Sequence, residues 1–331
     1  MRTVGDIKIY HWSEIQDSFR EADIFLGNGF SININNALNY RSLFDRFLTY
    51  LDSADQLMFK RFNTTNFEGI QTELSNAIEV NRIFGQDVNK QEAAIKNLKH
   101  GLIGAVRDLH PSYSQIDPNT IFQISQKLDW FGNIYTTNYD TFLYHITLAT
   151  LDRAKRNNSV KKNQDFFRNE CGRLTFKEGV LSGLRCIYYL HGALFIRTEA
   201  NEIIKISRGS RTQELLELIK LQVHLGYLPV FVSEGTTERK TETISKNRYL
   251  SYCFEALKAS FKDFVIYGFS FSKCDDHISE QFNNCRRRLA ISIYTKGLNE
   301  SQIHKYVKGV EERLYRNRCT DLKLYDSSTL F

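Results

Sequence analysis

Residues 23–31 read Asp-Ile-Phe-Leu-Gly-Asn-Gly-Phe-Ser, a mostly apolar run that stops at a glycine-rich turn. A continuous apolar stretch of this length predicts a strand that is covered on both faces, as in a parallel sheet. The same pattern of apolar run and polar or glycine-containing cluster recurs at residues 133–140, 186–192, 228–236, 264–270 and 289–297. Helical periodicity lies between these runs, so the sequence predicts an α/β fold with a Rossmann-like, doubly wound parallel sheet.

The segment between the first two predicted strands is too long for a single crossover helix. Apolar residues recur at helical spacing over residues 67–78, 95–109 and 121–128. Pro111 ends the second of these helices, and Asp117 followed by Pro118 marks the start of the third. We therefore expect a helical insertion at about residues 36–128, within a single domain that spans residues 1–331.

The composition excludes several classes of protein. The 331 residues carry a net charge of +6 from 44 basic and 38 acidic side chains, an excess too small to indicate nucleic acid but compatible with a polyanionic small molecule. The six cysteines form no CxxC pair, which argues against a zinc ribbon. No apolar run approaches the roughly 18 residues of a membrane span, so we expect no membrane association and a cytoplasmic location.

The clusters that follow the strands are the candidate site, because ligands of open parallel sheets bind beyond the carboxyl ends of the strands. Gly27 and Gly29 allow close backbone approach, and the amides from Gly27 to Gly29, with Asn28 between them, start a helix that attracts phosphate. The hydroxyl of Ser31 can donate to the same anion. A plain turn is the alternative interpretation of this segment.

The second cluster contains Thr137, Asn138 and Asp140. A carboxamide can hold a ribose hydroxyl or a water molecule, and a carboxylate can contact a carboxamide such as that of nicotinamide. The alternative is that Asn138 or Asp140 caps the next helix. His191 follows a wholly apolar strand, where it could exchange protons with a substrate hydroxyl near neutral pH or serve as a structural histidine.

Two further clusters lie late in the chain. Gly268 and Ser270 predict a second phosphate or ribose contact, with a tight turn as the alternative. The polar stretch at residues 272–277 contains Asp275, Asp276 and His277, whose spacing matches neither a nucleophile elbow nor a known metal pattern. We therefore expect helix capping there and no metal site.

Taken in order, these clusters resemble the signature series of the sirtuin-like (silent information regulator two-like) family. GNGFS at residues 27–31, TTNYD at 136–140, HG at 191–192 and GFS at 268–270 correspond to the usual sirtuin forms GAG-[IV]-S, TQN-[IV]-D, HG and GTS. The resemblance covers about residues 23–297. Sirtuin deacylases carry a zinc module with two CxxC pairs, which this chain lacks. TTNYD in place of TQNID and GNGFS in place of GAGIS are similar to the bacterial antiphage-defence branch of NAD-consuming effectors.

The resemblance implies a role for each matching position. Asn138 would lie beside the nicotinamide ribose and orient water, Asp140 would hold the nicotinamide carboxamide, and His191 would contact the ribose hydroxyls and act as base. The remaining positions would bind the rest of the dinucleotide: the pyrophosphate at Gly27, Asn28, Gly29 and Ser31, the adenosine half at Gly268 and Ser270, and adenine beside residues 294–297.

The implied activity is that of an NAD hydrolase (NAD glycohydrolase), which cleaves NAD as its substrate to nicotinamide and ADP-ribose. In antiphage defence by abortive infection, such an enzyme would be gated by homo-oligomerisation or by a partner protein. The alternative is a non-catalytic NAD- or ADP-ribose-binding regulatory subunit of a defence complex. A deacylase or ADP-ribosyltransferase is a third interpretation, and a nucleic-acid binder comes last because no basic stripe is evident.

Overall fold

The computed structural model describes residues 2–65, 67–207, 214–225, 227–232, 236–283, 287–314 and 321–331. These residues form a nine-stranded sheet with the order β1-β2-β14-β13-β12-β3-β4-β8-β5. β1 pairs antiparallel with β2, and every other neighbouring pair in this sheet is parallel. In chain order the strands are β1 (Arg2–Val4), β2 (Ile7–Tyr10), β3 (Asp23–Leu26), β4 (Ile134–Thr136), β5 (Asn163–Gln164), β8 (Arg185–Tyr189), β12 (Phe264–Tyr267), β13 (Leu289–Ile293) and β14 (Leu322–Asp326).

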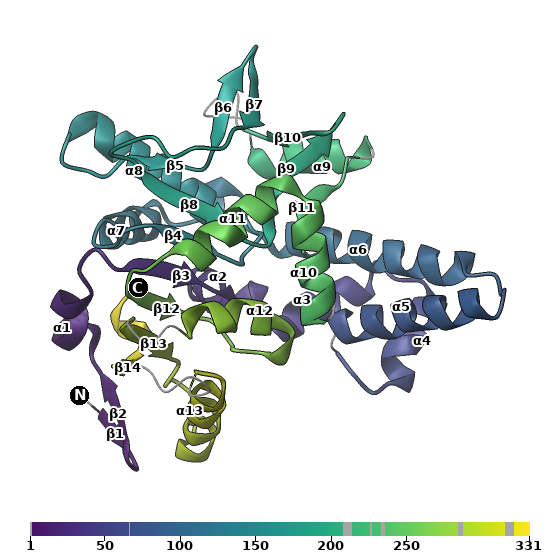
Figure 1. Cartoon of the computed structure of the whole chain (residues 1–331), viewed down its shortest axis with the longest axis horizontal. Helices are drawn as coiled ribbons and strands as arrows, with labels where there is room; N and C mark the ends of the chain where they lie inside the picture. The colour runs from purple at the N-terminus through teal and green to yellow at the C-terminus, as the bar shows by residue number, and fades with distance from the viewer. Residues whose placement is uncertain are drawn as a thin grey trace.

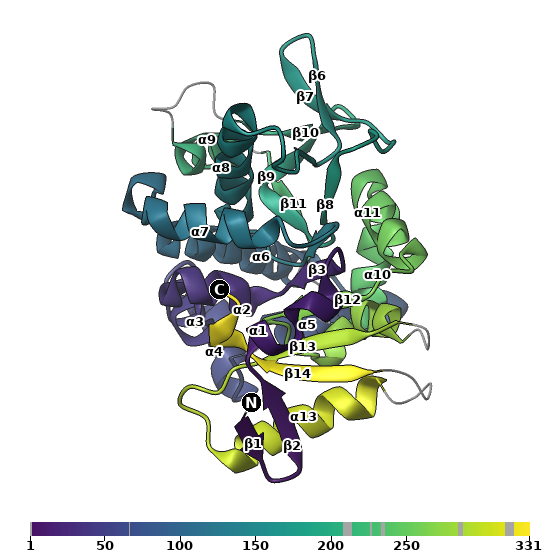
Figure 2. The ribbon, with the colours of Figure 1, turned by 90° about the vertical axis from the view of Figure 1, so that its left-hand side faces the viewer.

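The centre of the sheet is buried on both faces. Every residue of β3, β4, β8, β12 and β13 is buried, as expected for the continuous apolar runs that predicted these strands. Figure 2 shows α7 (Pro118–Leu128) and α8 (Phe142–Arg156) on one side of the sheet, and α10 (Thr237–Lys246) and α11 (Arg248–Ala259) on the other. The prediction of a Rossmann-like, doubly wound α/β fold is confirmed.

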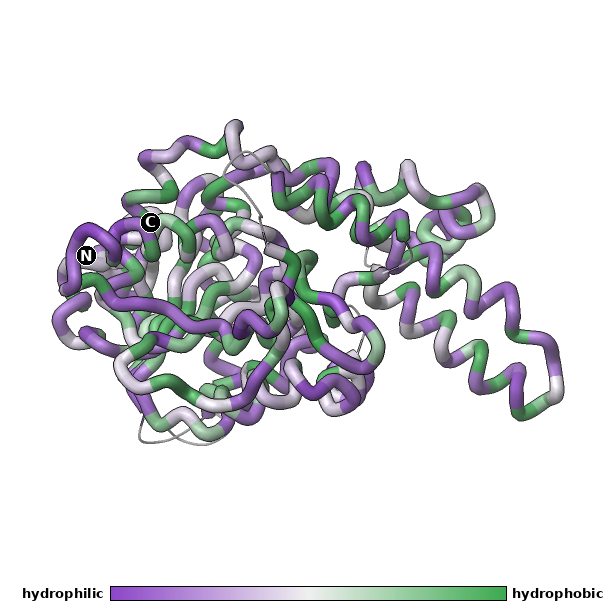
Figure 3. The backbone as a smooth tube through the Cα atoms, turned by 90° about the horizontal axis from the view of Figure 1, so that it is seen from above, coloured by the Kyte–Doolittle hydropathy of each residue, from purple (hydrophilic) through white to green (hydrophobic). Residues whose placement is uncertain are grey.

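Helices occupy the stretch from residue 36 to residue 128, as predicted. α6 ends before Pro111, and the side chain of Asp117 accepts hydrogen bonds from the first turn of α7, where Pro118 takes an initial position. Part of this insertion extends from the body as a helical arm (Figures 1 and 3). Besides α7, its helices are α3 (Tyr40–Leu48), α4 (Ser53–Arg61), α5 (Phe67–Ile83) and α6 (Asn89–Leu109).

A second sheet, which the sequence did not predict, adjoins the first. Its five strands are antiparallel and have the order β11-β9-β10-β7-β6. The prediction that residues 228–232 form a strand of the parallel sheet is wrong, because β11 pairs antiparallel with β9 and its last two residues are only half-buried. The strands are β6 (Phe167–Glu170), β7 (Arg173–Phe176), β9 (Gly192–Glu199), β10 (Glu202–Lys205) and β11 (Pro229–Phe231).

The remaining helices connect these strands or cover the sheet edges. The helix that leads into β12, α11, ends at Ala259, and Phe261 beyond its end is exposed. Within the described ranges, no helix has both the length and the apolar character needed to cross a bilayer. The helices not yet named are α1 (Trp12–Ile15), α2 (Asn28–Ile34), α9 (Leu215–His224), α12 (Asp276–Ser279) and α13 (Glu300–Leu314).

Candidate functional site

A cavity of about 1150 Å³ lies at the carboxyl ends of the central strands. On one side of β3 lies β4, the next strand of this sheet in the chain, and on the other side lies β12. The strand order therefore reverses between β3 and β12. Such a switch point is where open α/β sheets bind ligands. The cavity brings together most of the predicted site residues: Asn28, Gly29, Thr137, Asn138, Asp140, His191, Gly268 and Ser270 line it. Gly27 and Ser31 contact these residues from behind the lining.

The glycines at the end of β3 allow the backbone to touch the end of β12. A Cβ atom on Gly29 would lie 2.6 Å from the Cα of Gly268, and one on Gly27 would lie 2.6 Å from the carbonyl oxygen of Gly268. Gly268 itself has φ +66°, a left-handed conformation that favours glycine. These three positions therefore require glycine for packing, independently of any ligand.

Most amides at the start of α2 already donate to protein carbonyls. The N–H of Gly27 donates to Tyr267 at 2.8 Å, that of Gly29 to Gly268 at 2.8 Å, and that of Phe30 to Gly27 at 2.9 Å. The backbone N–H of Asn28 is the only one at this turn to which the described residues offer no hydrogen-bond acceptor. The pyrophosphate-binding role of this turn stays a prediction, and the structure leaves it one available amide.

Asn138 is 8% exposed, and its amide group is held from two sides. Its Nδ2 donates to the carbonyl oxygen of Gly27 and to the Oγ of Ser31, both at 2.9 Å. Its backbone N–H donates to the Oγ1 of Thr136 at 3.0 Å. Because both Nδ2 protons are used, the orientation of the carboxamide is fixed, and Oδ1 is the atom left to accept from a ligand or water.

Asp140 connects this group to the next helix. The hydroxyl of Ser31 donates to Oδ2 of Asp140, and the backbone N–H of Phe142, the first residue of α8, donates to Oδ1 at 2.9 Å. The capping interpretation therefore holds for Asp140. The carboxylate also borders the cavity, so a donor such as a carboxamide would have to approach its remaining lone pairs.

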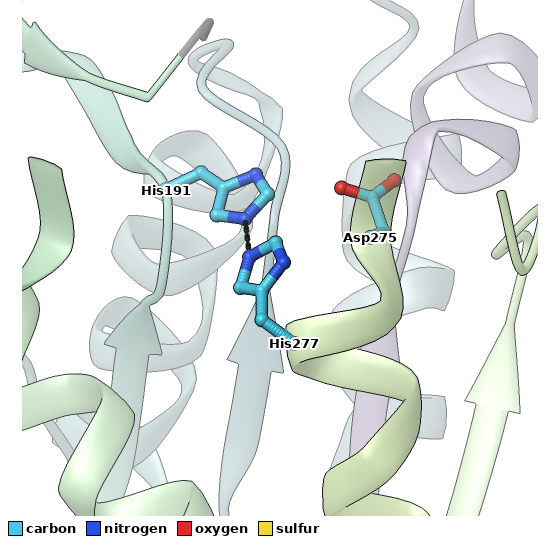
Figure 4. A group of neighbouring side chains, drawn as sticks. All are labelled: His191, Asp275 and His277. Carbon is cyan, nitrogen blue, oxygen red and sulfur yellow. Dashed lines mark hydrogen bonds between the residues drawn. The ribbon is translucent and has the colours of Figure 1, made fainter. Parts of the chain in front are cut away.

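His191 lies in the turn between β8 and β9 and is 5% exposed. Its Nε2 is 3.0 Å from the Nε2 of His277, which is 3% exposed (Figure 4). Burial, followed by the charges of His277 and Lys240, lowers the pKa of His191 well below its ordinary value. His191 is therefore neutral at physiological pH. The adjacent Gly192, with φ +77°, leaves room for β11 and not for a ligand, because its Cβ would lie 2.0 Å from the oxygen of Val230.

A buried ion pair lies beside the two histidines. The Nζ of Lys240, whose side chain is 2% exposed, is 2.9 Å from Oδ1 of Asp275. His191, His277 and Asp275 each present a possible ligand atom, all within 4.8 Å of one another. The ammonium of Lys240 already balances the charge of Asp275 and would repel a divalent cation, so we assign no metal to this group.

The capping expected at residues 272–277 accounts for only part of that stretch. Ser272 accepts from the backbone N–H of Cys274, which caps a short 3₁₀ helix (Lys273–Asp275). Asp275 instead binds Lys240, Asp276 accepts from Arg313 at 3.2 Å, and His277 contacts His191. Sequence reasoning missed Lys240 because nothing in the pattern of α10 places a lysine inside the protein.

The far end of the cavity follows β13 and β14. Tyr294 is 60% exposed and lines the cavity together with the exposed Lys296 and Ser328 and the buried Ser327. Ser270 is exposed, and the described residues give its hydroxyl no hydrogen-bond partner. Thr137 is half-buried at the cavity wall. This end has an aromatic face and hydroxyl groups, which suit a base and a sugar.

Comparison with known proteins identifies a family. No curated protein matches the chain. A family model with the description "Domain of unknown function (DUF4917)" matches residues 24–329, a range that begins in β3 and includes every strand end that lines the cavity. The chain belongs to the family that this model, DUF4917, defines.

Proposed function

We propose that this protein is an NAD hydrolase that cleaves the bond between nicotinamide and ribose. One observation carries the proposal: two segments more than 100 residues apart in the chain form one hydrogen-bonded group beside a cavity. In this group Ser31 bonds to Asp140, and Asn138 bonds to Gly27. The cavity volume of about 1150 Å³ exceeds the roughly 300–1,000 Å³ of ordinary small-molecule pockets, as an extended dinucleotide requires. His191 lines the same cavity.

The reaction needs little acid catalysis. The bond between C1′ and the nicotinamide nitrogen breaks, its electron pair leaves with nicotinamide as a neutral molecule, and the ribose becomes oxocarbenium-like. The oxygen of water bonds to C1′ and its proton is released, giving ADP-ribose. The site has to position the water and stabilise the developing positive charge. The Oδ1 of Asn138, held by its two Nδ2 contacts, suits the first task. The carboxylate of Asp140, which would also hold the nicotinamide carboxamide, suits the second.

His191 supplies the acceptor for a proton. Its neutral state at physiological pH leaves one ring nitrogen able to accept from water or a ribose hydroxyl. A base with a strongly lowered pKa is a weak one, so we assign His191 mainly to orienting that hydroxyl and to accepting its proton late.

The experiment follows NAD, nicotinamide and ADP-ribose by chromatography after incubation with the purified protein and candidate activators. We expect equal amounts of nicotinamide and ADP-ribose. Asn138→Ala and His191→Ala should each reduce turnover by about 10² to 10⁴, the usual cost of losing a positioned catalytic group. His224→Ala, which changes an exposed histidine of α9 outside the cavity, is the matched control. Intact turnover in both site variants would refute the assignment.

The proposal extends to a role in antiphage defence. An enzyme that removes NAD must be held inactive until it is needed, so we propose gating by self-association or by a partner protein. Expression in bacteria should then leave NAD unchanged before phage infection and deplete it afterwards. Loss of NAD in uninfected cells at the same protein level would argue against gating.

A non-catalytic NAD- or ADP-ribose-binding role is the second candidate, and one observation favours it. Nδ2 of Asn138, both oxygens of Asp140 and Nε2 of His191 all have protein partners already, as in a group that serves structure. Tight NAD binding by calorimetry, without product and unchanged in His191→Ala, would select this function over hydrolysis.

A further inference from the structure

The two buried histidines at the cavity wall form a pair that the proposed reaction does not by itself require. His191 comes from the turn after β8, and His277 comes from α12, 86 residues later. Their ring centroids are 5.2 Å apart with an interplanar angle of 15°, and their Nε2 atoms face each other at 3.0 Å. Figure 4 shows the two rings joined through these atoms, with the Asp275 carboxylate to one side.

A nitrogen–nitrogen hydrogen bond requires one proton between the two atoms. If both Nε2 atoms carried hydrogen, the hydrogens would collide, and if neither did, two lone pairs would face each other. The tautomers of the two rings are therefore coupled. When His191 carries its proton on Nε2, its Nδ1 is an acceptor, and neutral His277 must carry its own proton on Nδ1. The reverse arrangement makes Nδ1 of His191 a donor.

The outer nitrogens of the pair lie in different surroundings. Nδ1 of His191 points away from His277 and has no hydrogen-bond partner among the described residues, while the ring lines the cavity. Nδ1 of His277 is buried, and the described residues provide it with no hydrogen-bond partner. Nδ1 is thus the ring nitrogen of His191 that is left for a cavity ligand, and His277 is the only side chain among the described residues that bonds its other ring nitrogen.

Burial holds the pair in the state with one shared proton, because the charged groups around it act in opposite directions. Lys240 from α10 and Asp275 from the 3₁₀ helix form an ion pair beside the rings, and Asp276 on α12 is bound to Arg313 of α13. Phe254 from α11 packs against His277 and adds no charge. Burial lowers the pKa of His277 to about 4, with Lys240 also lowering it and Asp275 and Asp276 opposing, so both rings are neutral at pH 7.

We propose that His277 is a positioning residue: through its Nε2 it selects the tautomer of His191 and thereby the hydrogen-bonding character of the nitrogen that faces the ligand. The inference rests on the proposed hydrolysis for its catalytic consequence. When Nδ1 of His191 accepts a proton from water, the proton on its Nε2 can pass to Nε2 of His277. The pair then holds one added proton and one positive charge, with the Asp275 carboxylate within 4.8 Å.

The kinetic test compares His277→Gln and His277→Ala with the intact protein. We expect His277→Ala to lower kcat about 10- to 100-fold, less than loss of the base itself, with KM for NAD nearly unchanged. His277→Gln retains an amide that can accept from Nε2 of His191, so it should recover much of that loss and show an altered acid limb in its pH profile. Equal losses in both variants, or a change confined to KM, would overturn the assignment.

A second readout is independent of activity. Long-range ¹H–¹⁵N NMR spectra of histidine-labelled protein report which ring nitrogen carries the proton. We expect one defined tautomer for His191, retained in His277→Gln and lost or averaged in His277→Ala. An unchanged His191 tautomer in His277→Ala would overturn the proposal even if the protein hydrolyses NAD. If the tautomer of His191 is defined and depends on His277 but the protein does not turn over NAD, the pairing of the histidines stands and only the proposed hydrolysis is refuted.

Titration with Zn²⁺ during the same measurement separates the pair from a metal centre. Stoichiometric binding that shifts both histidines and disappears in Asp275→Asn would overturn the proposal, because the two nitrogens would then be ligands. Unchanged histidine signals support it.

Discussion

The contact between the end of β3 and the end of β12 gives a quantitative prediction for alanine substitutions at Gly29 and Gly268. Both glycines avoid a collision with packed backbone, and Gly268 in addition has a left-handed conformation. A methyl group on residue 268 would meet the Cα of Gly29 at 2.6 Å and would also place an alanine at φ +66°. A methyl group on residue 29 would meet the Cα of Gly268 at 2.6 Å, but Gly29 is in an ordinary helical conformation. Gly85 has φ +65° with nothing within 4 Å of its Cβ.

The three alanine variants therefore separate strain from collision. The left-handed conformation costs an alanine about 1–2 kcal/mol. Forcing a methyl group against packed backbone costs about 1–3 kcal/mol more. Gly85→Ala should lose the first amount, Gly29→Ala the second, and Gly268→Ala the sum, about 2–5 kcal/mol.

These losses convert to melting temperatures. For 331 residues that unfold together, an unfolding entropy of about 2.1 cal/mol/K per residue gives roughly 1.5 °C per kcal/mol. Scanning calorimetry should show a decrease of about 1.5–3 °C for Gly85→Ala and about 3–7 °C for Gly268→Ala. If Gly268→Ala melts no lower than Gly85→Ala, the β3–β12 contact is not as close as described and the reasoning about the cavity fails.

Three further outcomes follow from the site. Asp140→Asn replaces a carboxylate that accepts two hydrogen bonds within the protein, so nicotinamide release, measured by chromatography, should fall about 10- to 100-fold. Asp45→Asn, at an exposed position of α3, is the control and should have no effect in the same assay. Lys240→Met leaves the charge of Asp275 uncompensated and should destabilise the protein by about 3 kcal/mol. This is the lower end of the range for a broken buried pair, because Asp275 is 18% exposed. Adding Asp275→Asn should restore much of the lost stability in calorimetry, and no restoration would contradict the pairing. The pKa of His277 is about 4 in the folded protein against an ordinary 6.5, so the unfolded chain binds more protons between these pH values. The free energy of unfolding should therefore fall as the pH drops from about 6.5 to 4. If denaturant titrations show that this fall with pH is no shallower in His277→Gln, the result would count against the assignment.

Much of the fold was predictable because its central strands are buried on both faces. Runs such as residues 23–26 and 264–267 carry no polar alternation, and their ends are marked by glycine. Strands farther from the centre of the sheet gave weaker signals: β14, between β2 and β13, has a mixture of buried and half-buried residues, and the sequence did not predict it. The antiparallel sheet was missed because β6, β7 and β10 are short and partly exposed, so their pattern resembles that of loops.

The site was predictable where chemistry coincides with a strand end. Asn138, Asp140 and His191 follow β4 and β8 directly, and their convergence follows from parallel strands that share one edge. The groups around His191 come from helices instead, and no strand-end rule locates them. Lys240 and His277 lie on α10 and α12, whose placement against the cavity depends on tertiary packing. Their relation to His191 is therefore a property of the folded protein that the sequence pattern does not contain.

The glycines show a different limit of sequence reasoning. A glycine-rich turn after a strand predicts phosphate binding, yet Gly27, Gly29 and Gly268 are each required by backbone contact, and Gly192 is required by β11. The same residue type thus satisfies packing and ligand approach, and the sequence does not separate the two.

The most direct test of a dinucleotide site at these strand ends is a crystal structure with a non-hydrolysable NAD analogue. We expect the analogue in the cavity, with the nicotinamide ribose between Asn138 and His191 and the adenine toward Tyr294. An analogue bound elsewhere on the protein, or no binding at concentrations that saturate NAD-dependent enzymes, would contradict the account.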